Sequence, residues 1–148
     1  MTGVRGRILA VCISPAKHDK KTRVGTGVLK TDWGIEGDAH AGEPLRQVSL
    51  LAAESVRKME GKGMDLPPGI FAENLTTEGI NLLELKIGDR LRIGPDALCE
   101  ITQKGKECLK PCAVSARVGF CVMPIEGIFV RVLREGEVKE GDAIEVAT

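Results

Sequence analysis

The feature that most constrains the fold is a Gly-Asp turn that occurs twice and leads each time into a short alternating segment. Residues 87–93 read Ile-Gly-Asp-Arg-Leu-Arg-Ile, and residues 140–146 read Glu-Gly-Asp-Ala-Ile-Glu-Val. Gly and Asp are typical of tight turns, and alternation of apolar with other side chains is typical of a strand with one buried face. The two segments therefore predict two strands that are entered through the same kind of turn.

Short aliphatic runs bounded by Gly or Pro predict further strands. Residues 52–60 are rich in helix formers and stop at Gly61, which predicts one short helix. With 18 glycines, 7 prolines and only one Trp and three Phe, the chain has many turns and a core of Val, Ile and Leu. We expect a mainly β fold, a closed or nearly closed β-barrel of short strands with two or three short helices. The predicted strands are residues 7–13, 28–31, 47–51, 97–102 and 128–133, with a strand or strand end at 71–75.

Composition excludes several classes of protein. The 148 residues predict one domain over 1–148, with no linker or low-complexity segment. Lys plus Arg and Asp plus Glu number 21 each, which argues against a general nucleic-acid or anionic-membrane binder. The apolar run 8–13 is too short for a signal peptide or a membrane span. Five cysteines, an odd number, favour a reducing compartment, so we expect a cytoplasmic protein.

Reactive chemistry is most strongly indicated in residues 104–127. Cys112 follows Pro111, and if that proline begins a short helix, backbone N–H groups favour a negative sulfur at Cys112. Nearby positive charge also lowers the pKa of a thiol, and the thiolate is the reactive form. Cys121 lies in an apolar run and is expected to be inert. The stretch contains Cys108, Cys112, Cys121, Lys104, Lys106, Lys110 and Arg117.

Other readings of these cysteines stay open. A lone cysteine is more often a small structural hydrophobe than a catalyst. A structural zinc site is a second alternative, although Cys108 and Cys112 have C-x₃-C spacing and the chain has only His18 and His40 as histidine ligands. A redox couple between Cys108 and Cys112 is a third, although the spacing differs from C-x-x-C.

Two other segments contain candidate site residues. In the glycine-rich loop 34–42, Asp38 and His40 are two residues apart, so one could orient or charge the other. Glu73 and Asn74 are compatible with either a surface or a site role. The basic run 17–23 is more often a solvated face than an anion contact.

Taken together, four separate segments in this order resemble a MOSC domain, the type of domain found at the C-terminus of molybdenum-cofactor sulfurase. They are residues 34–42 (GIEGDAHAG), 69–75 (GIFAENL), 87–89 (IGD) and 106–124, which begins KEC and ends CVMP. The resemblance extends from about residue 8 to residue 146 and is greatest to small stand-alone prokaryotic members. It implies a β-rich barrel that handles sulfur or a molybdenum–sulfur cofactor.

The resemblance also suggests site residues. Cys112 matches the family cysteine that carries sulfane sulfur or ligates molybdenum, and Cys108 is a rival or a partner that resolves a persulfide. Glu73 and Asn74 match the part of the family that borders the cofactor, with His40 and Arg46 as neighbours. Lys104, Lys106 and Lys110 would lower the pKa of the thiol and attract a phosphate-bearing pterin.

Three functional hypotheses follow. The first is a sulfur carrier, sulfurtransferase-like protein or molybdenum-cofactor-dependent protein that acts through Cys112. The second is a non-catalytic ligand- or partner-binding module in molybdenum-cofactor biosynthesis, and the third is a barrel with a structural metal. The chain is too short to include a pyridoxal-phosphate desulfurase domain, so we expect a separate cysteine desulfurase or other molybdenum-cofactor biosynthesis proteins as partners.

Overall fold

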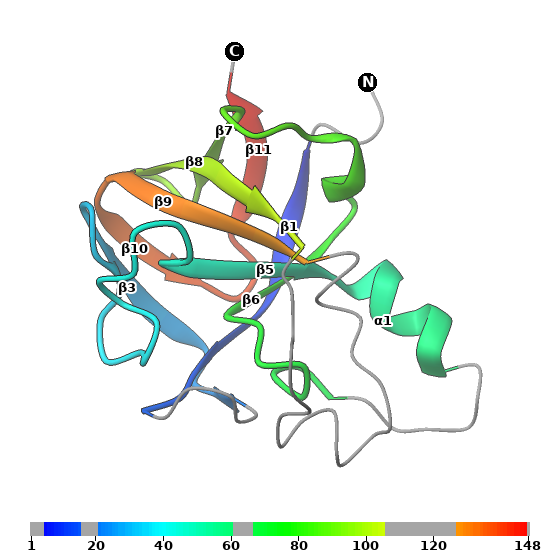
Figure 1. The fold of residues 1–148 in the computed structure, drawn as a ribbon. Coiled ribbons are helices and arrows are strands. Elements are labelled where there is room, and N and C mark those ends of the chain that lie inside the picture. The colour runs from blue at the N-terminus through cyan, green and yellow to red at the C-terminus, as the bar shows by residue number, and fades with distance from the viewer. Residues whose placement is uncertain (1–4, 16–20, 61–66, 106–126, 148) are drawn as a thin grey trace.

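Seven strands close into a barrel in the computed structural model, which describes residues 5–15, 21–60, 67–105 and 127–147. The ring closes because β11 pairs with both β7 and β1 (Figure 1). Around the barrel the strand order is β11, β7, β8, β9, β5, β6, β1. These strands are β1 (Arg5–Ile13), β5 (Val48–Ala52), β6 (Leu75–Glu78), β7 (Arg90–Ile93), β8 (Ala97–Lys104), β9 (Ile128–Arg134) and β11 (Ala143–Ala147).

Smaller elements lie against the barrel. A three-stranded sheet in the order β10, β3, β4 contributes Leu29, Ile35 and Val138 to the same aliphatic core as the barrel strands. The helix α1 directly follows β5 and lies at one side of the barrel (Figure 1). The bounds are β2 (Thr22–Arg23), β3 (Thr26–Lys30), β4 (Gly34–Ile35), β10 (Gly136–Lys139), α1 (Ala53–Glu60) and the 3-10 turn η1 (Leu82–Glu84).

One pair of barrel strands, β5 and β6, is parallel, whereas the other pairs are antiparallel. Two adjacent parallel strands need a crossover connection because both begin at the same end of the sheet. Here the crossover is residues 53–74, which include α1 and end immediately before Leu75. The last part of this connection, residues 67–74, therefore lies near the end of β1, which runs antiparallel to β6.

The two Gly-Asp turns are built alike. Asp89 Oδ2 accepts a hydrogen bond from Lys86 N–H at 2.8 Å, and Asp142 Oδ2 accepts one from Lys139 N–H at 3.0 Å. The glycine before each aspartate has a positive φ, 98° and 95°. Each turn also bonds to a neighbouring strand through the same pair of backbone groups, with Ile101 in one case and Ile8 in the other. The strands that follow, β7 and β11, pair with each other.

The sequence-based expectation of a closed, mainly β barrel is confirmed, and β1, β3, β5, β7, β8, β9, β11 and α1 form where strands and a helix were predicted. The described residues contain one α-helix and one 3-10 turn, against the two or three short helices expected. Residues 71–74 form a turn in place of extended strand because Ala72 has φ of 65°, so β6 begins only at Leu75. No helix in the described ranges has the length and apolar character needed to cross a bilayer.

The matched turns give a first prediction. Removing either aspartate, in Asp89→Ala or Asp142→Ala, deletes one hydrogen bond to a turn N–H, so each change should lower the free energy of unfolding by about 1 kcal/mol. Because the turns lie on different strands, the double variant should lose roughly the sum. Urea unfolding followed by circular dichroism measures this, with Asp96→Ala as an exposed control. A large loss of stability at one turn and none at the other would contradict the prediction that the two turns contribute equally to the free energy of unfolding.

Candidate functional site

The strand registers place five residues in one row across the barrel wall. Gln103 of β8 is opposite Phe129 of β9, and Phe129 is opposite Ser49 of β5. Asn74 continues the row, since its N–H donates to the Ser49 carbonyl at 3.0 Å and its own carbonyl accepts from Cys12 N–H at 2.7 Å. Residues far apart in the sequence therefore meet along one line.

This row faces the outside of the barrel. Side chains alternate between the two faces of a strand, and the interior core contains Val48, Leu50 and Val130, whose neighbours Ser49 and Phe129 must point outward. We refer to the row, together with the side chains that surround it, as the outer-face cluster. The cluster comprises Cys12, Lys21, Asp38, His40, Arg46, Ser49, Phe71, Glu73, Asn74, Gln103 and Phe129.

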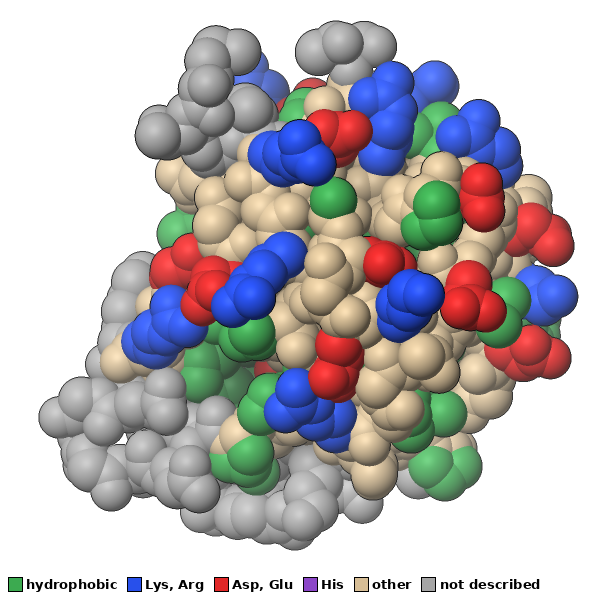
Figure 2. Space-filling view, turned by 180° about the vertical axis from the view of Figure 1, so that it is seen from behind, with side chains coloured by type: hydrophobic (Ala, Val, Ile, Leu, Met, Phe, Trp, Pro, Cys, Tyr) green, Lys and Arg blue, Asp and Glu red, His purple; other side chains and the backbone are tan. Residues whose placement is uncertain are grey.

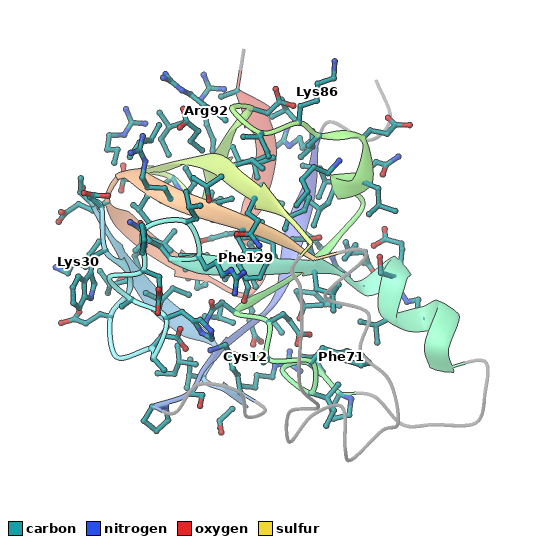
Figure 3. The ribbon with its side chains drawn as sticks, in the orientation of Figure 1. Cys12, Lys30, Phe71, Lys86, Arg92 and Phe129 are labelled. Atoms are coloured by element: carbon teal, nitrogen blue, oxygen red, sulfur yellow. The ribbon has the colours of Figure 1, made fainter. Side chains whose placement is uncertain are left out.

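Residues 67–74 cover the part of the row that contains Cys12 and Ser49. The Ser49 hydroxyl lies 3.3 Å from Ala72 O. Gly69 has φ of +90°, and a Cβ there would lie 2.2 Å from Lys21 O and 3.3 Å from Cys12 Sγ, so a side chain would not fit. Cys12 and Phe71 both lie in the lower part of the view in Figure 3, whereas Phe129 lies nearer the middle of the barrel wall. Consequently Cys12 is fully buried although it points away from the barrel interior.

Asn74 holds this covering segment to two strands. Its Oδ1 accepts hydrogen bonds from Ser49 N–H at 2.9 Å and from the Ser49 hydroxyl at 3.1 Å. Its Nδ2 donates to Cys12 O at 3.0 Å. Asn74 is 0 % exposed. An amide both donates and accepts, so it can join an N–H and a carbonyl in one plane, and this explains why Asn is used here.

Glu73 is also fully buried and is bonded to its own turn. Its Oε1 accepts from Phe71 N–H and its Oε2 from the Thr76 hydroxyl, each at 3.2 Å. Burial raises the pKa of Glu73 above its ordinary value, and hydrogen bonds from the surrounding backbone and Thr76 oppose this only in part. The carboxyl group thus shapes the wall behind the site and does not reach its surface.

The basic loop contains a buried cation. Lys21 Nζ lies 2.8 Å from Asp38 Oδ1 and 3.2 Å from His40 Nδ1, and the side chains of Lys21 and Asp38 are 0 % exposed. The Asp38 carboxylate also accepts two backbone N–H groups: Oδ1 accepts from Ser14 at 3.0 Å and Oδ2 from His40 at 3.1 Å. The expected proximity of Asp38 and His40 is therefore confirmed, whereas the expectation that run 17–23 is mainly solvated is wrong for Lys21.

Burial by itself would raise the pKa of Asp38, but contacts with His40 and Lys21 and the N–H of Ser14 outweigh it and hold that pKa well below its usual range. A carboxyl group whose pKa is lower in the folded state stabilises the fold above its unfolded pKa, near 4. This contribution is lost only when the pH falls through the lower, folded-state pKa. The ion pair is therefore intact at neutral pH.

Arg46 lies at the other end of the row. Its guanidinium group lies 5.7 Å from the centroid of the Phe129 ring, and its Nε donates to Gln103 Oε1 at 3.2 Å. Gln103 Nε2 in turn donates to Gly105 O at 2.8 Å, and Gly105 N–H donates to Gly127 O at 2.6 Å. Arg46 is therefore connected through Gln103 to the two glycines that flank residues 106–126.

The charge of Arg46 is not neutralised by a carboxylate among the described residues. Many other described arginines do have such partners, and opposite charges are interspersed over the face of the molecule in Figure 2. A guanidinium has five N–H donors, and only one of those of Arg46 is used by Gln103, so the group can bind a phosphate or another oxyanion. The arginines with a glutamate partner are Arg7, Arg23, Arg57, Arg90, Arg92 and Arg131.

The candidate residues from the sequence are thus distributed unevenly. His40, Arg46, Glu73 and Asn74 belong to the outer-face cluster. Lys104 does not belong to the cluster, because its ammonium group donates to the carbonyl of Leu83, a residue outside the cluster, at 2.9 Å. Cys108, Cys112, Lys106 and Lys110 lie outside the described residues.

Sequence reasoning missed Lys21, Ser49 and Gln103. A buried lysine inside a basic run has no local signal, because its partners Asp38 and His40 are about 20 residues further along the chain. Ser49 lies within a predicted strand and Gln103 directly follows one, and their place in the row is known only from the strand register.

The polar groups of the outer-face cluster suit some parts of the cofactor that the resemblance implies and not others. The donors of Arg46 and His40 suit phosphate and oxo oxygens. Burial raises the pKa of Cys12 and of Cys99 to about 12, and for Cys12 the charge of Glu73 adds to this, so neither thiol suits a molybdenum ligand. The described part of the chain holds no group of three or more His, Cys, Asp and Glu side chains able to bind a metal ion. The described residues thus suit the anionic groups of such a cofactor, and a thiolate ligand would have to come from residues 106–126.

Comparison with known proteins identifies the family. The family model described as the MOSC domain matches residues 37–145, which is most of the chain. The chain therefore belongs to the MOSC domain family, which is associated with the molybdenum cofactor. No curated protein matches the chain significantly.

Solved structures agree with this fold. The YuaD protein from Bacillus subtilis has a TM-score of 0.77 and 25% sequence identity, over 96% of this chain and 95% of that chain. YiiM from Escherichia coli has a TM-score of 0.72 and 22% identity, over 97% of this chain and 70% of that chain. YiiM from Geobacillus stearothermophilus has a TM-score of 0.73 and 20% identity, over 97% and 75%.

The buried Glu73 gives a prediction about pH. Because its pKa is higher in the folded than in the unfolded state, the folded protein binds more protons above pH 4.5, and stability falls as the pH rises from there toward the folded pKa. Glu73→Gln keeps the shape and removes this titration. We expect it to raise the melting temperature at pH 8, by roughly 2–4 °C per kcal/mol, and to flatten the pH dependence.

Thermal melts of both proteins between pH 4 and pH 8 test this. Glu73→Ala is the matched control and should lower stability at every pH, because it deletes the hydrogen bonds that the carboxyl group accepts from Phe71 N–H and from the Thr76 hydroxyl. Equal slopes against pH for Glu73→Gln and the parent protein would show that burial does not control this carboxyl group.

The buried thiols give a prediction about reactivity. Cys12 and Cys99 are 0 % exposed, and each has a pKa raised to about 12, so very little of either is a thiolate at neutral pH. We expect iodoacetamide at pH 7 to leave both unmodified in the folded protein and to modify both in urea. Peptide mass spectrometry locates the label. Rapid native labelling of Cys12 would mean that residues 67–74 do not protect it.

Proposed function

We propose that this MOSC domain protein handles sulfur, or binds a molybdenum–sulfur cofactor, through the thiolate of Cys112. The observation that carries the proposal is the environment of Arg46, a guanidinium that has no carboxylate partner among the described residues and is connected through Gln103 to Gly105. Gly105 and Gly127 flank the segment that contains both Cys112 and Cys108. An anion-binding group beside a cysteine-bearing segment is what a phosphate-bearing pterin and its sulfur chemistry require.

In this proposal Cys112 is the nucleophile or metal ligand, and Cys108 is either its rival or the thiol that resolves a persulfide. Lys106 and Lys110 lie within six residues of Cys112 in the sequence and favour its thiolate form. Lys104 contributes positive charge from the base of the same segment. His40 and Arg46 bind the cofactor, while Glu73 and Asn74 support the wall behind it.

The sulfur-transfer step needs no external oxidant. The Cys112 thiolate attacks the outer sulfur of a persulfide on a cysteine desulfurase, a new S–S bond forms at Cys112, and the donor S–S bond breaks. The donor cysteine leaves as a thiolate, so sulfane sulfur moves without net oxidation or reduction. A cysteine desulfurase in the cytoplasm is therefore the expected donor.

A second candidate function is a non-catalytic module that binds a ligand or a partner protein in molybdenum-cofactor biosynthesis. The position of Arg46 favours this candidate equally, because anion binding by a guanidinium needs no reactive thiol. The two functions are distinguished by whether Cys112 accepts sulfur, which the carrier role requires and the binding role does not.

The proposal predicts a reducible gain of one sulfur at Cys112. The protein is incubated with a cysteine desulfurase and cysteine, alkylated, and its intact mass is measured without reductant; digestion then locates the sulfur. Cys112→Ser should abolish loading and leave the circular dichroism spectrum unchanged. Cys108→Ser is the matched control and should still accept sulfur, although the persulfide should persist longer if Cys108 resolves it.

No added sulfur in the parent protein, or undiminished loading in Cys112→Ser, would refute the carrier role. In the first case metal analysis of the purified protein distinguishes the remaining possibilities, since molybdenum retained by the parent and lost in Cys112→Ser would assign Cys112 as a ligand.

A further inference from the structure

The environment of His40 determines which of its ring nitrogens carries a proton. Nδ1 lies 3.2 Å from Lys21 Nζ and 3.7 Å from Asp38 Oδ2. The second distance is too long for a hydrogen bond. Lys21 is therefore the hydrogen-bond partner of Nδ1.

An ammonium group has three N–H donors and no acceptor, so Lys21 can only donate to His40. Nδ1 must then be the unprotonated nitrogen, and in the neutral ring the proton is on Nε2. Lys21 is itself held by Asp38 Oδ1 at 2.8 Å, and both side chains are fully buried. The ion pair cannot easily rotate away, so the tautomer of His40 is fixed by a rigid partner.

The Nε2–H group of His40 has no partner among the described residues. The His40 side chain is 16% exposed, in contrast to the fully buried Lys21 and Asp38. A donor that is oriented by a buried ion pair and reaches the edge of the protein is suited to a ligand. The ligand must supply a hydrogen-bond acceptor.

The charges around this donor favour an anion. Lys21 and Asp38 neutralise each other, while Arg46, at the end of the same loop as His40, has no carboxylate partner in the described part of the chain. Lys21 also polarises the ring through Nδ1, which strengthens Nε2–H as a donor. The net charge of Lys21, Asp38 and Arg46 together is therefore positive.

We propose that His40 donates its Nε2–H to an oxyanion, and that Lys21 and Asp38 are positioning residues that hold His40 in the tautomer able to do so. The ligand supplies an anionic oxygen acceptor, either from a phosphate group or from an oxo group of molybdenum. This inference rests on the proposed function for the identity of the anion, and it assigns to His40 one specific contact within that site. The tautomer itself is independent of the function.

The first test is spectroscopic. Long-range ¹H–¹⁵N correlation spectra of the ¹⁵N-labelled protein at pH 7.5 distinguish protonated from unprotonated imidazole nitrogens. We expect His40 to have an unprotonated Nδ1 and a protonated Nε2, with His18→Gln used to assign the two histidines. Lys21→Met removes the donor and keeps the length of the side chain, so it should shift His40 toward a mixture of tautomers. A protonated Nδ1 in the parent protein would overturn the proposal.

The second test is a titration of the same sample with sodium molybdate and, separately, with sodium phosphate at constant ionic strength. We expect a saturable shift of the His40 Nε2 signal with at least one anion; molybdate alone identifies an oxo group, and phosphate alone identifies a phosphate group. His40→Ala should weaken binding about tenfold or more. His40→Gln retains an N–H donor near Nε2 and should restore part of the affinity.

Arg46→Gln should also weaken binding, whereas the control Arg134→Gln should not, because Arg134 donates to Asp96 O elsewhere. Absence of any response to either anion, or equal affinity in His40→Ala, would overturn the donor role. These readouts do not involve Cys112. Failure here therefore leaves the sulfur-loading result standing, and failure of sulfur loading leaves the tautomer and anion results standing.

Discussion

The geometry of this molecule depends most on the side-chain amide of Asn74. Strands β5 and β6 are parallel, so their connection must return along the barrel before β6 can begin. Asn74 ends that connection and bonds to Ser49 and to Cys12 through both its backbone and its side chain. The returning segment is thereby fastened to two strands at one point. The cover over the outer face, including Gly69 and Glu73, is placed as a consequence.

Features that depend on neighbours in the sequence could be predicted. The Gly-Asp turns are local, because each aspartate bonds to an N–H three residues earlier, and a positive φ suits the glycine before it. The alternation of aliphatic residues also predicted the strands, because a strand with one buried face has a pattern that a few consecutive residues are enough to reveal. The turn at residues 71–74, where Ala72 has a positive φ, was harder to predict. Its contacts are the hydrogen bond from Phe71 N–H to Glu73 and the approach of the Ser49 hydroxyl to Ala72 O, and Ser49 is distant in the sequence.

The candidate site depends on pairs that are distant in the sequence, and it was predicted only in part. The Asp-x-His spacing correctly placed Asp38 beside His40, because two residues separate them. Nothing local distinguishes Lys21 from the other lysines in its run, and only its ion pair with Asp38 accounts for its burial. Without that partner, a buried ammonium would be costly. A short basic run is therefore weak evidence for a solvated surface, because a carboxylate distant in the sequence can pair with one of its lysines and allow that lysine to be buried.

Burial and charge divide the polar groups of the outer-face cluster into two kinds. Cys12 and Glu73 are enclosed, and burial raises the pKa of each, so at neutral pH burial opposes a charge on either group. A thiol with a pKa of about 12 is a thiolate in roughly one molecule in 10⁵ at pH 7. His40 and Arg46, in contrast, have donors that the described part of the chain leaves unused. The outer-face cluster thus keeps the thiol of Cys12 protonated while it presents the hydrogen-bond donors of His40 and Arg46. This arrangement would direct sulfur chemistry to a cysteine outside the cluster.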